Sequence, residues 1–534
     1  TTDDSSNTLT IQDFGLGMNA EELVENLGTI AHSGSKAFLE ALQSDGEKND
    51  SLIGRFGVGF YSVFMVADKV QAFTRTWKKD GVGQCWESDG SGSYTIEESS
   101  DQQRGTKVVV NLKEDFSEFA KEDRVKEIIK KYSAFVQFPV FVNGEKVNTV
   151  DAIWLRSKNE IKDEEYEEFY KFQSNDYEAP LMRMHFSADA PLEINSLLFV
   201  PKRNMEKMGM FRNENKVALH CRKVLIDPEP KALFPEWLRF LKGVVDSSDL
   251  PLNVSREVMQ DSELLRKLNQ VLTKRFLRFL NEQSKKEPDD FLSFWNEFGV
   301  LIKEGAATDF TYKEDLAKLL RFESTALEPG KLTGLDEYID RMAKDQKDIL
   351  FLFGKSRQSI EAGPYLEALK ARSLEVLLLT EPVDEYVMQS VREYKEKKII
   401  SADSDELKLE KLDQEPEGKA LNKKDTKSLC KWLKESLKEK VSEVETGDRL
   451  IDSPVCIVGG DGLGGASARR VMKMMQGGED AMPASPVKLQ VNQRHPIIKG
   501  LSKLIDSDQD TAELVANQLL DNALATANLL DDPR

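Results

Sequence analysis

The segment Leu9-Thr-Ile-Gln-Asp-Phe-Gly-Leu-Gly-Met18 and two glycine-rich segments after it decide the fold of this chain. Residues 9–12 are predicted to form a strand, and residues 13–18 the turn that ends it. After a short helical segment come Gly28-Thr-Ile-Ala-His-Ser-Gly34 and Gly54-Arg-Phe-Gly-Val-Gly-Phe-Tyr61. Glycine lets the backbone approach a phosphate closely and direct its N–H groups toward it. Asp13 ends the strand, where its carboxylate can accept a hydrogen bond from the amino group of a base. The order of these segments therefore indicates a nucleotide pocket.

The composition limits the classes of protein to which the chain can belong. Its 534 residues are enough for roughly three or four domains. Charged residues make up 31% and hydrophobic residues 40%, which is typical of a soluble globular protein. The formal net charge of -19 argues against nucleic acid or an anionic membrane as a partner, because phosphate contacts need a basic face. No apolar run approaches the roughly 18 residues that span a bilayer.

Cysteine and histidine are scarce and widely spaced. The four cysteines form no C-x-x-C pair, so a reducing compartment is a simpler interpretation than a disulfide framework. The four histidines show no metal-ligand spacing, and no metal site is predicted within the chain. No signal or transit peptide is visible. Because the chain opens at Thr1 rather than Met, we expect a fragment or a processed form.

The first 148 residues are predicted to form an α/β sandwich with a largely antiparallel sheet. Asn19 followed by Glu22 is typical of a helix start, with asparagine as the N-cap and glutamate at the third helical position. Leu23, Leu27 and Ile30 give that helix one apolar face. The other predicted elements are strands at residues 70–76, 85–87, 94–97 and 107–112, a helix at 124–135, and a strand and turn at 139–144.

Two boundaries divide the chain into three predicted domains: residues 1–148, 149–405 and 415–534. The fold class is therefore α/β and multidomain, with a partial N-terminal sandwich, a middle α/β domain and a C-terminal α/β domain. The middle domain is predicted to contain helices at 163–172 and 257–279 and strands at 197–201, 217–226, 349–353 and 375–379. The C-terminal domain is predicted to begin with a helix at 423–441, to contain a strand at 455–458, and to end with a helix at 511–530.

The order of the glycine motifs resembles the ATP site of the heat-shock protein 90 chaperones. Its four parts are Asp13-x-Gly-x-Gly-Met18, Asn26-Leu-Gly-Thr-Ile-Ala-x-Ser-Gly34, Gly54-x-Phe-Gly-Val-Gly-Phe-Tyr-Ser62 and Gly105-Thr106. These chaperones belong to the gyrase, histidine kinase and mismatch-repair ATPase superfamily. The resemblance extends over essentially all 534 residues. Segments such as Leu332-Thr-Gly-Leu-Asp-Glu-Tyr338 resemble the mitochondrial paralogue most, and bacterial members share several of them.

The resemblance implies an ATP-dependent molecular chaperone that clamps unfolded or partly folded clients in a dimer cycle, in protein folding and the stress response. ATP and Mg²⁺ are the implied cofactors. The Asp13 carboxylate would accept a hydrogen bond from the adenine amino group, with Thr106 assisting through water. The implied nucleotide-binding residues are Asp13, Gly17, Met18, Asn26, His32, Ser33, Gly34, Gly57, Val58, Gly59, Phe60, Thr106 and Arg256. His32 departs from the family's usual Lys or Arg, and Arg55 from its usual Gln.

Each of these residues also has a simpler structural interpretation. Asp13 could be a turn residue that bonds its own backbone. Met18 could be a core methionine, and Asn26 a polar position on a helix. Residues 57–60 could form a tight turn between a strand and a helix.

Arg256 is the candidate catalytic residue of the middle domain, in Asp249-Leu-Pro-Leu-Asn-Val-Ser-Arg-Glu257. A cation at a helix N-terminus is unfavourable by about 0.3–1 kcal/mol, and a bound phosphate would reverse that effect. The resemblance implies that Arg256 reaches the γ-phosphate, with Gln260 one turn further on. The alternative is a surface arginine paired with Glu257 or Asp261.

Client and partner contacts are expected from two further features. Trp154 and the methionines Met472, Met474 and Met475 are candidate client-binding residues, since exposed methionine suits a promiscuous surface; burial in the core is the alternative. Helix 511–530 carries apolar residues on two faces, and the resemblance implies a homodimer contact there. One face has Leu514, Leu519, Ala523, Ala527 and Leu530, and the other Val515, Leu520, Leu524 and Leu529.

The resemblance also indicates what the chain lacks. The family's first helix, with the Glu that activates water and the Asn that binds magnesium, is expected upstream of Thr1. The end of the C-terminal dimer contact is expected beyond Arg534. Slow ATP hydrolysis is therefore expected, and a client-binding scaffold without turnover is the alternative. A topoisomerase or mismatch-repair ATPase is disfavoured by the acidic charge. The expected location is the mitochondrial matrix, with a bacterial-type cytoplasm as the alternative.

Overall fold

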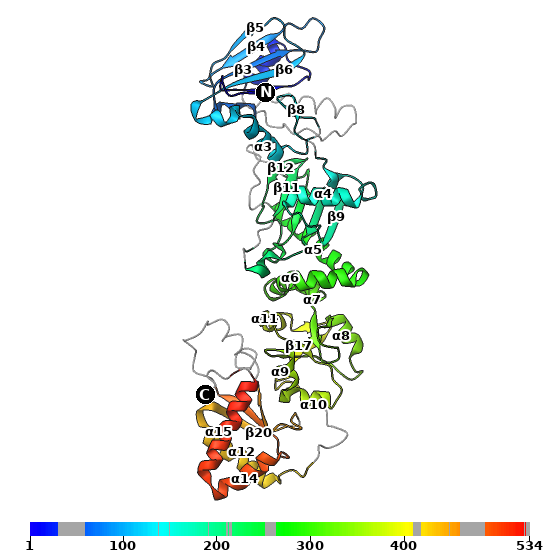
Figure 1. Ribbon diagram of the computed structural model, residues 1–534, viewed down its shortest axis with the longest axis vertical. Helices are drawn as coiled ribbons and strands as arrows, with labels where there is room; N and C mark the ends of the chain where they lie inside the picture. The colour runs from blue at the N-terminus through cyan, green and yellow to red at the C-terminus, as the bar shows by residue number, and fades with distance from the viewer. Residues whose placement is uncertain are drawn as a thin grey trace. The chain divides into compact units, whose positions relative to one another are not determined.

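The computed structural model describes residues 1–29, 59–136, 138–148, 150–190, 192–209, 212, 216–250, 263–409, 418–447, 449–459, 486–527 and 529. The chain divides into two compact units, Thr1–Thr273 and Lys274–Arg534 (Figure 1). Both units combine sheets with helices, which confirms the predicted α/β multidomain class. The three predicted domains divide the chain differently, and their boundaries stay predictions.

The first unit begins with a six-stranded sheet in the order β1-β2-β6-β3-β4-β5. Its strands are β1 (Thr2–Asp3), β2 (Thr8–Gln12), β3 (Ala67–Arg75), β4 (Gln84–Ser88), β5 (Thr95–Glu98) and β6 (Gly105–Leu112). All neighbouring pairs are antiparallel, as predicted. Gln12 at the end of β2 lies opposite Lys107 near the start of β6. The turn that follows β2 therefore lies beside the beginning of β6.

Helix α1 (Ala20–Leu27) begins where the sequence predicts. The Asn19 side chain accepts a hydrogen bond from the Glu22 backbone N–H, and the Glu22 carboxylate accepts one from the Asn19 N–H, both at 2.8 Å. This reciprocal pair satisfies two N–H groups that a helix start leaves free. Leu23 is fully buried in a core that includes Val70 and Trp86 of the sheet. The capped start and the buried leucine together fix α1 on the sheet.

The rest of the first unit contains a second sheet, of five strands in the order β12-β11-β13-β10-β9. These strands are β9 (Met182–Ala188), β10 (Ile194–Val200), β11 (Lys216–Cys221), β12 (Val224–Asp227) and β13 (Lys242–Asp246). Only β11 and β13 run parallel among these pairs of described strands. The sequence predicts one strand at 217–226, and the structure splits it because Arg222 and Lys223 have positive φ angles of 52° and 69° and form a turn.

The helices of the first unit lie close to their predicted positions. The single-turn helices η1 (Phe60–Met65), η2 (Glu114–Ala120), η3 (Ile153–Leu155) and η5 (Met205–Met208) and the strands β7 (Phe141–Val142) and β8 (Glu145–Lys146) join the larger elements. Helix α3 (Glu122–Tyr132) begins earlier and ends earlier than the prediction of 124–135. Helix α4 (Asp163–Ser174) buries Tyr166, Phe169 and Tyr170. Helix α5 (Glu263–Lys286) crosses the division between the two units.

The second unit contains a six-stranded sheet in the order β15-β14-β17-β16-β19-β18. The strands of this sheet are β14 (Phe322–Ser324), β15 (Leu332–Thr333), β16 (Ile349–Phe353), β17 (Leu377–Leu379), β18 (Glu393–Tyr394) and β19 (Lys397–Ser401). The helices in this part of the chain are α6 (Pro288–Thr308), α7 (Lys313–Ala317), α8 (Leu335–Arg341), α9 (Arg357–Glu361), α10 (Glu367–Lys370) and α11 (Pro382–Val391). Lys303 of α6 is buried, and its Nζ lies 2.8 Å from Asp384 Oδ1 and 3.0 Å from Glu381 Oε2. This ion pair fastens α6 to α11 within the unit.

Among the described residues, the end of the second unit has a three-stranded sheet and three helices. The elements are α12 (Lys423–Leu437), β20 (Val441–Thr446), β21 (Val455–Val458), β22 (Val487–Val491), α14 (Pro496–Ser507) and α15 (Gln509–Thr526). Their apolar side chains share one core with those of the preceding sheet. The predicted bounds of β16 and β21 are matched residue for residue, whereas α12 ends at Leu437 because the chain turns there into β20.

Two searches of the described residues give negative results. No helix among them combines the length and apolarity needed to cross a membrane. No group of three or more His, Cys, Asp or Glu side chains among them is placed to hold a metal ion.

Candidate functional site

The turn after β2 is held to the start of β6 by hydrogen bonds in both directions. The Asp13 N–H donates to the Thr106 carbonyl at 2.9 Å, and the Thr106 N–H points back at Asp13 Oδ1 at 3.3 Å. Oδ1 also accepts from the Gly15 N–H at 2.8 Å. The interpretation of Asp13 as a turn residue is therefore correct for one of its two oxygens.

The second oxygen of Asp13 has no hydrogen-bond partner among the described residues, and the residue is exposed. The Oδ1 bonds fix the plane of the carboxylate. Oδ2 is consequently a positioned acceptor that faces outward from the turn. A carboxylate accepts hydrogen bonds more strongly than a neutral oxygen does, so this atom suits an amino group such as that of adenine.

Thr74 connects the parts of this site, and it was not among the residues predicted from the motifs. Its hydroxyl donates to the Gly105 carbonyl at 3.0 Å, accepts from the Met18 N–H at 2.9 Å, and lies 3.1 Å from the Thr106 hydroxyl. Thr74 is fully buried. The available signal was a threonine in the buried, alternating series of β3, after Val70 and Ala72.

Gly17 and Gly105 allow these backbones to approach each other. Gly17 has a φ angle of +62°, and a Cβ there would lie 1.9 Å from the Arg75 carbonyl oxygen. Gly105 has a φ angle of +113°, and its Cβ would lie 2.3 Å from the Asp13 carbonyl oxygen. Both positions favour glycine by conformation and by space. The motif glycines are thus explained here by close contact of protein backbones, which also shapes the rim of the pocket.

Asn26 on α1 carries an acceptor that the described residues leave without a partner. Its amide nitrogen donates to the Glu22 carbonyl at 2.8 Å. Its Oδ1 is buried and has no partner among the described residues. A buried polar atom without a partner costs about 1–3 kcal/mol, so an unpaired Oδ1 indicates a place where a bound group would supply the missing hydrogen bond.

Met18 and Phe60 are packed rather than open. Met18 lies against the core of the first sheet, as its simpler interpretation predicts. The ring of Phe60 packs edge-on against Trp86, with centroids 5.6 Å apart. Gly59 precedes η1 and has open space around its Cβ position. Phe60 therefore supports the pocket from its core side.

Several predicted site residues lie outside the described residues. These are His32, Ser33, Gly34, Gly57 and Val58 of the glycine segments, Arg256 and Gln260 of the middle domain, and the client candidates Met472, Met474 and Met475. The structure therefore brings together Asp13, Gly17, Met18 and Thr106, with Thr74 as their common partner.

Trp154 is fully buried, which contradicts its prediction as a client contact. Its ring lies 4.7 Å from that of Phe135 and 5.4 Å from that of His220, and its Nε1 donates to Asp246 Oδ2 at 3.1 Å. The indole is therefore a core side chain whose polar atom is satisfied, and it has no free surface for a client.

Helix α15 shows a different exposure from the one predicted for the dimer contact. Leu519, Leu520 and Ala523 are all buried in the core of their own unit, although Leu520 was predicted on a different face from Leu519 and Ala523. Leu514 is 72% exposed, although it was assigned to the same stripe as Leu519. The correction follows from the helical spacing: Leu519 and Leu520 lie three and four residues after the buried Ala516 and so flank one buried stripe, whereas Leu514 lies away from that stripe.

The described residues fit the adenine end of an ATP molecule. They provide a positioned carboxylate oxygen on Asp13, the Thr106 hydroxyl beside the buried Thr74, and on Asn26 a buried acceptor without a partner among the described residues. These groups can select a base with an amino group and exclude one that presents only acceptors. Such an arrangement binds and orients a nucleotide.

Comparisons with known proteins show the family of this chain. The sequence model of the family described as "Hsp90 protein" matches residues 142–534. "Chaperone protein HtpG" of Desulfitobacterium hafniense is 51% identical over 536 residues, which cover 100% of this chain and 87% of that protein. "Heat shock protein 75 kDa, mitochondrial" of Bos taurus is 42% identical over 545 residues, which cover 100% of this chain and 77% of that protein. "TNF receptor-associated protein 1 homolog, mitochondrial" of Dictyostelium discoideum is 41% identical over 537 residues.

The fold is that of an α/β multidomain protein, and the relatives are chaperones. The chain belongs to the Hsp90 family. Members of this family are chaperones that bind ATP and hydrolyse it weakly, and they typically form homodimers. The predicted family resemblance is confirmed. Both bacterial and mitochondrial proteins are among the relatives.

Proposed function

We propose that this protein is an ATP-dependent molecular chaperone whose nucleotide is recognised by Asp13. The observation that carries the proposal is the geometry of the Asp13 carboxylate. Oδ1 is held by the N–H groups of Gly15 and Thr106, while Oδ2 has no partner among the residues that the structure describes. A free oxygen on an otherwise fixed carboxylate is suited to bind an amino group of a ligand.

In this proposal each described residue has a defined task. Asp13 accepts the adenine amino hydrogen, and the Thr106 hydroxyl holds a water molecule beside it. Asn26 Oδ1 receives a hydrogen bond from the sugar or from phosphate-bound water. Bound ATP supplies a phosphoanhydride bond whose hydrolysis can be coupled to a change in the protein. We assign no Mg²⁺ ligand among the described residues.

Arg256 and Gln260 are proposed to act at the γ-phosphate, as the resemblance implies. An arginine that joins the nucleotide only in a closed state stabilises the transition state more than the ground state. Arg256→Ala should therefore reduce the turnover number far more than it reduces ATP affinity. Equal losses in the two quantities would assign Arg256 to binding alone.

An aggregation assay tests the chaperone function directly. The protein would be mixed with a model enzyme that unfolds on mild heating, and light scattering would be followed with and without ATP. Wild type should suppress scattering, and ATP should change the extent of suppression. Asp13→Asn should keep any suppression that needs no nucleotide and lose the ATP effect. Wild type without any effect on scattering would contradict the proposal.

A client-binding scaffold without turnover is the second candidate. The same assay separates the two: suppression that is identical with ATP, with ADP and without nucleotide would support the scaffold.

We also propose a homodimer that uses the exposed side of α15, and a location in the mitochondrial matrix. Leu514, at 72% exposure, is the large apolar side chain that α15 leaves to solvent. Because the relatives include both bacterial and mitochondrial proteins, a bacterial-type cytoplasm is the alternative location. Fractionation of the source cells would decide between these compartments.

A further inference from the structure

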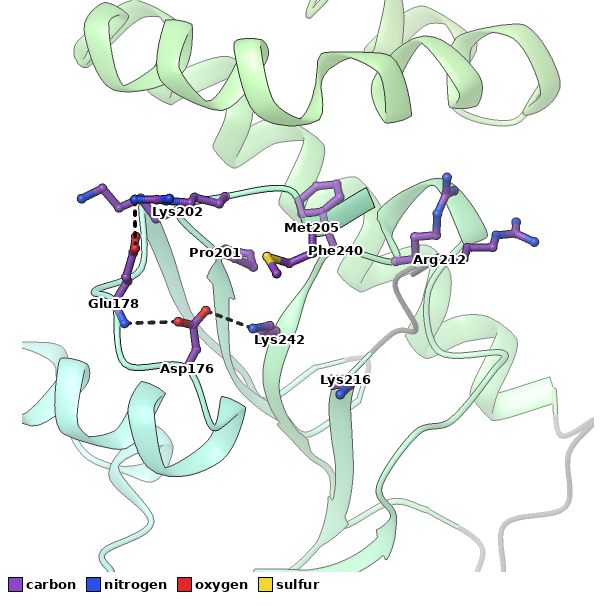
Figure 2. A pocket seen from close by; sticks show the side chains of 11 residues that line it. Asp176, Glu178, Pro201, Lys202, Met205, Arg212, Lys216, Phe240 and Lys242 are labelled. Atoms are coloured by element: carbon purple, nitrogen blue, oxygen red, sulfur yellow. Dashed lines mark hydrogen bonds and ion pairs between the residues drawn. The ribbon is translucent and has the colours of Figure 1, made fainter. Parts of the chain in front are cut away.

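A pocket lined by six cations lies at one end of the five-stranded sheet, in the first unit (Figure 2). Strand β10 ends there, and two other strands begin there: its neighbour β13, and β11 on the far side of β13. The pocket has a volume of about 510 Å³. Its lining residues are Asp176, Glu178, Pro201, Lys202, Arg203, Met205, Arg212, Lys216, Arg239, Phe240 and Lys242. Six basic and two acidic side chains thus line a hollow in a chain whose net charge is -19.

The backbone register holds two of these lysines together. Lys216 and Lys242 are directly paired positions on the parallel strands β11 and β13. Paired positions project to the same face of a sheet, and like charges there are destabilising. Lys242 is partly neutralised, since its Nζ lies 3.2 Å from Asp176 Oδ2. Lys216 has no acidic partner among the described residues, so one of the two charges is left uncompensated.

The frame of the pocket is fixed by a separate ion pair. Arg239 donates to both carboxylate oxygens of Glu206, at 2.8 and 3.1 Å, and the two side chains are only 11% and 18% exposed. This two-point contact joins the start of β13 to η5. It holds Met205 beside the buried ring of Phe240, so the pocket has an apolar floor. The floor is a fixed part of the structure.

The rim cations remain available to a ligand. Lys202 is exposed and has no ion-pair partner among the described residues. Arg203 contacts Glu178 at 3.1 Å, but these side chains are 60% and 43% exposed. An exposed pair of this kind contributes about 0–1 kcal/mol, so a multiply charged anion can displace the glutamate. In Figure 2 Lys242 and Lys216 lie below the floor residues Pro201 and Met205, and Lys202 lies at the upper left, above Pro201.

We propose that this basic pocket binds a compact polyanion, a small molecule that carries several phosphate or carboxylate groups. The volume lies within the range of about 300–1,000 Å³ that is common for small-molecule sites. Lys202 and Lys216 would contact the anion, and Arg203 would join them by exchanging Glu178 for a ligand oxygen. An extended polyanion such as nucleic acid is disfavoured, because the acidic remainder of the surface would repel it. The site lies apart from Asp13, and it needs no nucleotide or client.

Calorimetric titration of the whole chain tests this proposal, with inorganic tripolyphosphate and citrate as probes. The matched variants are Lys202→Glu/Lys216→Glu in the pocket and Lys171→Glu/Lys231→Glu outside it. Both control lysines are exposed, and both double variants change the net charge equally. Wild type and the control should bind tripolyphosphate at one saturable site, and the pocket variant should lose at least tenfold in affinity. Lys202→Gln/Lys216→Gln removes the two cations without adding negative charge, so it checks whether the glutamates act by disturbing the fold. Its affinity for tripolyphosphate should also fall, by less than that of the glutamate variant.

Each result decides for or against the pocket. Binding of tripolyphosphate alone would support a phosphate ligand, and equal binding of citrate would support a polyanion site of either chemistry. Weakening of the same size in the pocket and control variants would show an adventitious ion only and would overturn the proposal. Saturable binding that is unchanged in both pocket variants would place the anion elsewhere and overturn it as well.

Discussion

The indole Nε1 of Trp154 donates a hydrogen bond of 3.1 Å to Oδ2 of Asp246 in the core of the first unit. The same oxygen accepts a second bond, of 2.9 Å, from the Lys223 N–H. Burial raises the pKa of Asp246, and these donors oppose that rise. His220 lies against the same indole. A buried polar group thus connects the turn of β11 and β12 to the helical turn that holds Trp154.

His220 should make the stability of the first unit dependent on pH. Burial lowers the pKa of His220 from its ordinary 6.5 to about 4. Between these values the unfolded chain binds a proton that the folded chain does not. Stability is therefore complete above pH 6.5 and falls as the pH is lowered toward 4, by about 3 kcal/mol from this residue. His220→Phe should remove that part of the decline.

Chemical denaturation of both proteins between pH 4 and 7 measures this effect. The two curves of unfolding free energy against pH should diverge in slope below pH 6.5. Parallel curves over this window would show that His220 does not titrate on unfolding.

The turn at Gly17 should tolerate no side chain. Gly17→Ala would place a Cβ 1.9 Å from the Arg75 carbonyl oxygen at a φ angle of +62°. We expect a loss of at least about 2 kcal/mol, because the left-handed conformation alone costs about 1–2 kcal/mol. Gly500→Ala in α14 is the control, since nothing lies within 4 Å of its Cβ position. That change should stabilise by about 0.5–1 kcal/mol. Equal thermal midpoints for the two variants would refute the close approach at Gly17.

The buried pair Lys303–Asp384 should be sensitive to the loss of one partner. Asp384 is 2% exposed at its side chain and Lys303 is 6% exposed, and their atoms are 2.8 Å apart. Asp384→Ala leaves the ammonium with only the half-exposed Glu381, so we expect a loss of about 3 kcal/mol. Glu435→Ala removes an exposed partner of Lys431 in the same unit and should change stability by less than about 0.5 kcal/mol. Equal losses of unfolding free energy for the two variants in urea denaturation would contradict a stabilising role of the buried pair.

Substitutions of Leu514 and Leu520 should distinguish residues of the dimer contact from residues of the core. Leu514→Asp introduces a charge at an exposed position, so it should weaken dimers without loss of stability. Leu520→Ala empties a fully buried position and should destabilise the unit by about 2–5 kcal/mol. Sedimentation equilibrium and thermal unfolding would be measured for both variants. Dimers of undiminished affinity in Leu514→Asp would place the interface elsewhere.

Local sequence signals predicted elements well where one short interaction determines them. The Asn19–Glu22 capping pair and the apolar strands β16 and β21 are of this kind. The split of residues 217–226 was missed because Arg222 and Lys223 adopt positive φ angles without the glycine or asparagine that usually mark a turn. The exposed and buried sides of α15 could not be assigned correctly, since its leucines and alanines occupy most of the helix circumference.

The residues of the candidate site that belong to the motifs could be predicted, but the hydrogen bonds that join them through Thr74 could not. The motif order indicated Asp13, Gly17 and Thr106, which the structure brings together. Thr74 joins them through contacts between strands far apart in the sequence, and no local pattern distinguishes it from an ordinary buried threonine. Trp154 was misassigned because a tryptophan in a short apolar segment is compatible both with an exposed contact surface and with a core that contains a buried carboxylate.

The most direct test of the proposed function is the ATP affinity of Asp13→Asn. Asparagine keeps an oxygen for the Gly15 N–H, so the turn is preserved, but it removes the negative charge and presents an NH₂ group where Oδ2 was. Asp89→Asn is the matched control, because Asp89 accepts from the Ser91 N–H in a similar turn. Isothermal titration calorimetry should show a loss of at least about 2–3 kcal/mol, or 30- to 100-fold in affinity, for Asp13→Asn and wild-type affinity for Asp89→Asn. ATP binding by Asp13→Asn as tight as that of wild type would contradict the proposed site.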